Sequence, residues 1–197
     1  MSKIQESAFD TATRVAAGAT RSTYDRTSIW LHWATALLVV VQFAMAEVWD
    51  WFPKPTRHTM EGVHVSLGIL LAAVIVARLA WRLIPGHQVE SLESGAVKLA
   101  SKAVHYLLYA LLVAQASLGF LWRWAQGEPL SFFGLFVIPS PVEAADRATR
   151  RTYHEWHENV GWAIVILAAG HAFAALYHHY ALRDRVLVRM LPRGAKA

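Results

Sequence analysis

The ten histidines of this 197-residue chain, which contains no cysteine, are its best candidates for chemistry. His157 and His171 are fourteen residues apart, a separation of about 21 Å along an α-helix. Fourteen steps of about 100° return to within ~40° of the starting direction, so both imidazoles leave one helix face. This spacing suits two stacked haems, each with an imidazole on its iron. Both haems must be b-type and non-covalent, because c-type attachment needs cysteine.

Two more histidines lie at matching depths in other apolar segments, and an ionisable side chain inside a membrane span marks a functional site by default. His32 lies near the inner start of the first segment and His171 near the inner end of the last, so we expect this pair to hold an inner haem. His64 and His157 each lie in the first turn of their segments, and we expect them to hold an outer haem.

Other interpretations of these histidines stay open. His105 lies at the inner depth and competes with His32; as a non-ligand it would contact a haem propionate or a quinone. Zinc is a rival metal, but two histidines per site leave its tetrahedral shell incomplete, unless neighbours supplement the outer pair. Small residues would let a flat macrocycle approach the backbone, although they also mediate plain helix packing. The residues concerned are His154, Glu155 and Glu158 for zinc, and Gly68, Gly119 and Gly161 for close approach.

Four apolar blocks must position these side chains. The chain is 55% hydrophobic and 17% charged, with a mean hydropathy of +0.30, which predicts a membrane protein. Each block is long enough for a hydrocarbon core of about 30 Å. The expected fold is therefore an all-α, integral membrane four-helix bundle with two b-type haems. The expected spans are residues 28–46, 62–83, 99–124 and 155–182.

The connections carry prolines and glycines, which end helices. The apolar run Leu130–Ile138 is too short to span and is expected to form an interfacial or re-entrant segment. The residues expected to interrupt or end helices are Pro53, Pro55, Pro85, Gly86, Gly127 and Pro129.

The lysines and arginines predict the orientation. Thirteen lie in the two terminal segments and the second connection, and six lie on the other side. The positive-inside rule then places both termini in the cytoplasm of a bacterial cell, with the chain in the inner membrane. The expected division is a cytoplasmic N-terminal extension over 1–26, a dihaem domain over 27–183 and a basic cytoplasmic tail over 184–197. The net charge of +5 is attributed to topology and anionic lipid contact, not to nucleic acid.

Several motifs resemble the bacterial cytochrome b561 family of four-helix dihaem membrane proteins. They are "IWLHW" around His32, "GVHVSLGI" around His64, "YHEWHE" through His157, "GHAFAALYHHY" from His171 and the closing "VLVRMLPR". The similarity runs from Tyr24 to Arg193, and the motifs occur in the family's order.

The resemblance implies that these four histidines are the axial ligands, in agreement with the depth argument. It also implies a superoxide oxidase that passes electrons from superoxide at the outer side to ubiquinone near the inner side. His178 corresponds to a residue at the family's quinone site. The family's lysine in the cytoplasmic connection has no counterpart, because the sequence there reads Gln-Val-Glu-Ser-Leu-Glu and Lys98 and Lys102 are displaced.

Each side of this reaction has candidate residues and a simpler explanation. Outer basic residues would steer the superoxide anion, or they belong to a solvated loop with neighbouring carboxylates. His178 and His179 would bond and protonate a quinone, or they anchor the helix at the interface. The outer basic set is Arg57, His58, Arg147, Arg150, Arg151 and His154.

Two rival functions remain. One is a haem b electron-transfer subunit that links a partner dehydrogenase, of the hydrogenase or formate dehydrogenase type, to the quinone pool. Short loops favour an independent enzyme that requires no protein partner, only lipid, superoxide and ubiquinone. The other rival is a non-redox, histidine-rich metal transporter, which would show no haem absorbance.

Overall fold

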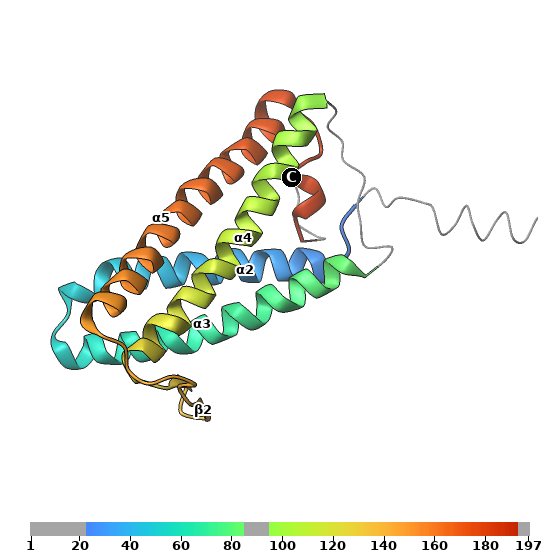
Figure 1. Ribbon diagram of the computed structural model, residues 1–197. Helices are drawn as coiled ribbons and strands as arrows, with labels where there is room; N and C mark the ends of the chain where they lie inside the picture. The colour runs from blue at the N-terminus through green and yellow to red at the C-terminus, as the bar shows by residue number, and fades with distance from the viewer. Residues whose placement is uncertain (1–22, 85–94, 193–197) are drawn as a thin grey trace, which may run out of the picture.

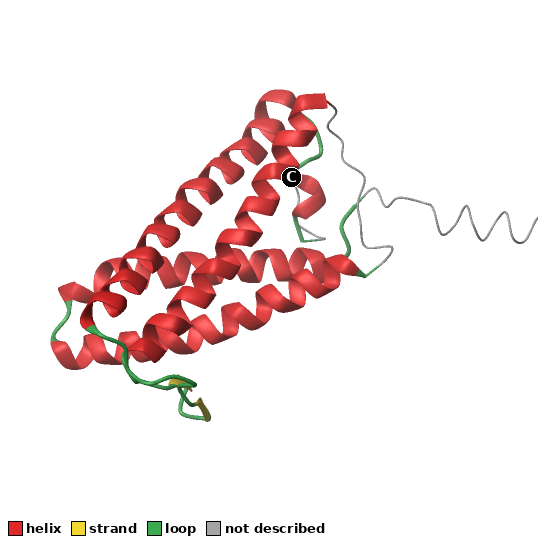
Figure 2. Ribbon diagram, in the orientation of Figure 1, coloured by secondary structure: helices red, strands yellow, loops and turns green. Residues whose placement is uncertain are grey.

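A computed structural model describes residues 23–84 and 95–192. It contains four helices that are long and apolar enough to cross a membrane, which confirms the expected all-α membrane bundle. Helices dominate the described chain (Figure 2). The four helices are α2 (Arg26–Val48), α3 (Lys54–Leu83), α4 (Gly95–Ala125) and α5 (Arg147–Tyr177) (Figure 1).

Polar caps and a proline set the helix starts. The carboxylate of Asp25 accepts a hydrogen bond from the Ser28 N–H at 2.9 Å, and Asp146 caps α5 in the same way, as N-cap residues do. Pro55, expected in the connection, instead lies in the first turn of α3, where its missing N–H is harmless. Consequently α3 and α5 each begin eight residues before the expected spans, as polar helical extensions.

The run Leu130–Ile138 forms a β-hairpin between α4 and α5. Strand β1 (Leu130–Phe132) pairs antiparallel with β2 (Phe136–Ile138). The hydroxyl of Ser66 in α3 lies 3.1 Å from the Ser131 carbonyl oxygen and accepts a hydrogen bond from the Phe133 N–H at 3.0 Å. This hairpin therefore packs against α3 two residues beyond His64.

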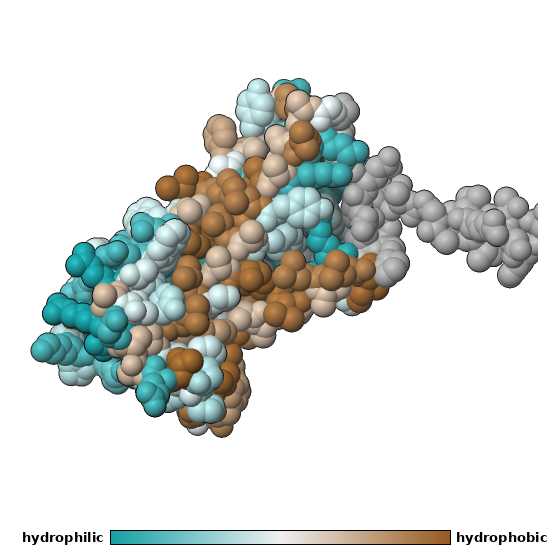
Figure 3. Space-filling model, viewed as in Figure 1, coloured by the Kyte–Doolittle hydropathy of each residue, from teal (hydrophilic) through white to brown (hydrophobic). Residues whose placement is uncertain are grey.

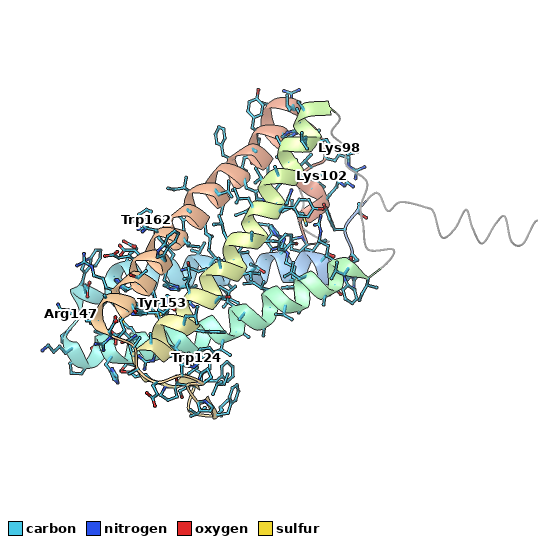
Figure 4. All side chains as sticks on the ribbon, in the orientation of Figure 1. Lys98, Lys102, Trp124, Arg147, Tyr153 and Trp162 are labelled. Atoms are coloured by element: carbon cyan, nitrogen blue, oxygen red, sulfur yellow. The ribbon has the colours of Figure 1, made fainter. Side chains whose placement is uncertain are left out.

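The helices form two pairs, α2–α3 and α4–α5, which lie together at one end and diverge towards the other (Figure 1). We name the first the β-hairpin end; it also holds the 3-10 turn η1 (Trp49–Trp51) between α2 and α3. The other is the basic end, where α3 finishes and α4 begins. Lys98 and Lys102 lie at the basic end, and Arg147 lies at the β-hairpin end (Figure 4). Basic residues assigned to opposite sides of the membrane thus occupy opposite ends.

The shared core between the pairs is small. It centres on Leu71 and Ile75 of α3, Leu112 of α4 and Ile164 of α5. Large apolar side chains face outward instead; Phe173, for example, is 70% exposed. Brown, apolar atoms cover the middle of the helices in Figure 3, and teal atoms gather where α5 begins. Such an outer surface suits lipid.

The residues after α5 fold back onto the basic end. Helix α5 continues as a π-helical turn (His178–Leu182), and Arg183 then adopts a left-handed conformation. After a further 3-10 turn (Val188–Met190), the Met190 carbonyl accepts a hydrogen bond from the Trp33 indole N–H at 2.8 Å. The predicted basic tail is therefore packed on the helices as far as Pro192. The predicted extension lies outside the described residues, except for 23–26.

Candidate functional site

The four predicted ligand histidines come together as the two expected pairs. His32 of α2 faces His171 of α5, with 6.3 Å between ring centres and 78° between ring planes. His64 of α3 faces His157 of α5, with 6.2 Å and 76°. We name these the basic-end pair and the β-hairpin-end pair. The helical rise between the two α5 histidines separates the pairs by about 21 Å.

Both spacings fit a single metal ion between two imidazoles. Each imidazole nitrogen bonds such an ion at about 2 Å, and the ring centre lies ~1 Å behind it, so opposed rings have centres about 6 Å apart. The observed values of 6.2 and 6.3 Å match this requirement. Ring planes that are nearly perpendicular are compatible with it, because two axial rings need only share the bonding axis.

The β-hairpin-end pair is prepared for ligation on both rings. The His157 Nδ1–H donates to the Gln115 carbonyl oxygen at 3.2 Å, which leaves Nε2 as the ligand atom. In this structure that Nε2 lies 3.3 Å from the Gln115 side-chain nitrogen. The Nδ1 atom of His64 is buried and has no hydrogen-bond partner among the described residues. A metal between the two rings would bond one nitrogen of each, in place of the Gln115 amide at His157.

Glycine provides the space for the His157 ring. A Cβ atom on Gly119 of α4 would lie 2.9 Å from His157 Cε1, closer than real Cβ contacts. At Gly161 and Gly68 a Cβ would come within 3.2 and 3.3 Å of the side-chain nitrogens of Gln115 and Gln42. These three glycines were expected to allow close approach; the approach seen here is by imidazole and amide groups.

At the basic end, the geometry separates His32 from His105. The His105 Nδ1–H donates to the Ser101 carbonyl at 2.6 Å, and its ring centre is 5.0 Å from that of His171. That spacing is about 1 Å too short for two ligands of one iron, whereas His32 has the required spacing. The distances therefore favour His32 as the partner of His171.

The zinc interpretation gains no support. Across residues 23–84 and 95–192, no group of three or more histidine and carboxylate side chains is arranged to hold a metal ion. His154, a proposed supplementary ligand, packs against Trp122 with ring centres 4.5 Å apart. Glu155 forms an ion pair with Arg151.

The outer basic residues are partly neutralised. Arg57 pairs with both Asp50 and Glu61, and Arg151 pairs with Glu155. A steering field at the β-hairpin end would therefore rest mainly on the arginines at the start of α5, such as Arg147 (Figure 4).

Beyond α5, His178 forms a close pair with a carboxylate. The His178 Nδ1 lies 2.5 Å from Asp184 Oδ2, and the other carboxylate oxygen accepts from the Val186 N–H at 2.9 Å. Burial raises the pKa of Asp184, but the hydrogen bonds from His178 and Val186 outweigh it, so the pKa lies below its usual value. An ionised Asp184 would orient the ring and favour its Nδ1–H form.

Sequence reasoning missed a repeat that relates the two helix pairs. In the first helix of each pair, α2 or α4, the repeat has a histidine and, ten residues later, a glutamine. In the second helix of each pair, α3 or α5, it has a histidine, a glycine four residues after that histidine and a basic residue fourteen residues after it. The members are His32, Gln42, His64, Gly68 and Arg78 in the first pair, and His105, Gln115, His157, Gly161 and His171 in the second.

The structure gives both copies of the repeat similar contacts. Gln42 donates to the His64 carbonyl oxygen at 3.1 Å, and Gln115 contacts His157. The ligand pair at the β-hairpin end consists of equivalent residues. At the basic end the copies differ, because Arg78 takes the position of His171.

Comparison with known proteins places the chain among membrane cytochromes. The family model described as prokaryotic cytochrome b561 matches residues 23–193. "Cytochrome b561 homolog 2" of Escherichia coli is 33% identical over 186 residues, which cover 87% of this chain and 93% of that protein. "Cytochrome b561 homolog 1" of the same organism is 33% identical, over 86% of this chain and 97% of that protein. "Probable superoxide oxidase CybB" of Yersinia pestis is 28% identical, over 86% and 96% respectively.

Proposed function

The chain belongs to the prokaryotic cytochrome b561 family, and from this premise we propose that it is a dihaem cytochrome that oxidises superoxide and reduces ubiquinone. Membership and the four apolar helices make it a multi-pass inner-membrane protein of electron transfer that binds b-type haem. The number of haems, the two substrates and the direction of transfer are the proposal.

The observation that carries the proposal is the pair of matched imidazole spacings at two depths. His32 and His171 would hold one haem, and His64 and His157 the other. When bound, haem supplies reversible one-electron transfer between its ferric and ferrous states. The protein residues contribute axial nitrogen atoms, fixed ring directions and an apolar surround that excludes water.

Superoxide is assigned to the β-hairpin end, which we place on the periplasmic side. The resemblance to the Yersinia pestis protein supports this substrate. The conversion needs no proton or bond cleavage, because superoxide loses one electron and becomes dioxygen. The arginines at the start of α5 would draw the anion towards that end.

Ubiquinone is assigned to the basic end, which the positive-inside rule places in the cytoplasm. Two superoxide ions supply two electrons, and one ubiquinone takes them up with two protons to form ubiquinol. The close contact between His178 and Asp184 supports a role in proton supply. Asp184 would accept a hydrogen bond from Nδ1–H, and in the protonated form of the ring Nε2–H would donate to a quinone carbonyl oxygen.

Haem content and turnover of the purified protein test the proposal in two stages. We expect two haems per chain by pyridine haemochrome, a reduced-minus-oxidised b-type spectrum and superoxide-dependent reduction of a soluble ubiquinone. His178→Ala should slow quinone reduction and leave both haem spectra intact. A protein without haem would refute the whole proposal. A haem-loaded protein that leaves superoxide decay at its spontaneous rate would refute the substrate, and would favour a subunit that serves a partner dehydrogenase.

A further inference from the structure

We propose that Arg78 binds a propionate carboxylate of the haem held by His32 and His171, and so raises the reduction potential of that haem. The inference rests on the proposed function, because it requires a haem at the basic-end pair. It assigns a residue that is neither an axial ligand nor part of the quinone site.

Arg78 is a charged side chain in a membrane-spanning helix. Its guanidinium lies 3.0 Å from the His32 Nδ1 atom and 5.1 Å from the centre of the Tyr109 ring. None of the carboxylates in the described parts of the chain forms an ion pair with it. A cation at this depth is costly unless an anion compensates it.

The contact with His32 cannot persist once His32 binds iron. Arginine can only donate hydrogen bonds, so the Nδ1 atom that it approaches here must be an acceptor. A neutral imidazole that binds iron through Nε2 carries its proton on Nδ1 and is a donor there. Ligation would therefore remove His32 as an acceptor of this guanidinium, which could then donate to a haem carboxylate.

The repeat explains why the guanidinium faces this site. Arg78 occupies in α3 the position that His171 occupies in α5, fourteen residues after the equivalent histidines His64 and His157. Arg78 and His171 both face His32, one from each helix pair. A histidine there ligates the iron, whereas an arginine is always charged and fits a carboxylate with two parallel hydrogen bonds. Haem b carries two carboxylates, as propionates, at its edge.

Arg82 provides a matched control on the same helix. It lies four residues further on, carries the same charge and packs over Tyr106 and Tyr109, at 5.9 and 5.7 Å from their ring centres. Arg82 makes no hydrogen bond to any of the basic-end histidines in the described structure. Any effect of net charge or of stacking on Tyr109 should therefore be shared by both arginines, and an effect of carboxylate binding should not.

The test is a spectroelectrochemical titration of the detergent-solubilised holoprotein and its variants Arg78→Leu, Arg78→Lys and Arg82→Leu. The haem that is lost from His171→Ala identifies the basic-end potential. Removing the cation leaves the propionate uncompensated and disfavours the reduced haem. We expect Arg78→Leu to lower the equilibrium constant for reduction about tenfold, a shift of about 59 mV for one electron. Arg78→Lys should retain most of the potential, and the other haem should be unchanged.

Each outcome decides the question. If Arg78→Leu loses the basic-end haem while Arg78→Lys retains it, a cation is required and the proposal is supported. A potential in Arg78→Leu that equals that of Arg82→Leu would overturn it, as would loss of the haem from Arg78→Lys as well. A wild-type chain with fewer than two haems would instead refute the proposed function. Two haems that are insensitive to Arg78 would refute the present inference alone.

Discussion

Gly119→Ala should weaken binding of the haem at the β-hairpin end. The new Cβ would lie 2.9 Å from His157 Cε1, whereas ordinary contacts begin at 3.4 Å. The ring or the helix must therefore move by about 0.5 Å, the difference between these values. The ring cannot turn freely, because its Nδ1–H is bonded to the Gln115 carbonyl.

Overpacking of this kind costs about 1–3 kcal/mol, which corresponds to a roughly fivefold to more than 100-fold weaker haem site. The higher helix propensity of alanine offsets part of this cost, because alanine stabilises a helix over glycine by up to ~1 kcal/mol. The control is Gly170→Ala, beside His171 on α5, where an added Cβ meets no atom within 4 Å. This second variant has the same propensity gain without the clash.

The assay is the rate of haem transfer from each purified variant to an excess of a soluble apo-haem acceptor, with pyridine haemochrome as the measure of initial content. We expect one haem to leave Gly119→Ala faster than the wild type, with the other unaffected. Equal rates for Gly119→Ala and Gly170→Ala would refute the view that Gly119 exists to admit the His157 ring.

Three further predictions concern the rest of the structure. His32→Ala should lose one haem per chain by pyridine haemochrome, whereas His105→Ala should keep both; two haems in His32→Ala or one in His105→Ala would mean that His105 is the ligand. Burial raises the pKa of Asp25, but hydrogen bonds from Ser28 and Trp81 outweigh it and leave the pKa below its usual value. The ionised carboxylate therefore stabilises the fold fully above the unfolded pKa of about 3.9. This stabilisation is lost as the pH falls through the lower pKa of the folded protein. Asp25→Ala should thus cost about 1 kcal/mol near pH 7 and less below pH ~4, by thermal unfolding in detergent; a pH-independent loss would contradict the role of its charge. Superoxide-driven haem reduction should slow as salt rises from about 10 to 150 mM, and a flat stopped-flow response would exclude steering by the arginines near Arg147.

The repeat indicates how two similar helix pairs support one transfer path. At the β-hairpin end equivalent residues face each other, with His64 opposite His157. At the basic end the equivalence is broken, because Arg78 stands where the second pair has His171. The two ligands at the β-hairpin end are thus equivalent residues of the repeat. At the basic end, Arg78 and His105 lie beside the two ligands. On the proposed function, this difference gives the two haems different potentials and a direction for electron flow.

The sequence by itself determined the four spans and the common face of His157 and His171. A bilayer requires about 20 apolar residues per helix, and helical rise and rotation depend on spacing alone. Only the tertiary structure decided that His32 rather than His105 has the spacing of a ligand partner, that Gly119 borders the His157 ring, and that Arg78 contacts His32. Depth along a helix is one coordinate, which spacing supplies, whereas the distance between two rings also depends on how helices cross and turn about their axes. Likewise, the pairing of β1 with β2 and the fold-back of residues 183–192 depend on contacts with distant residues, such as Ser66 and Trp33, that local sequence does not record.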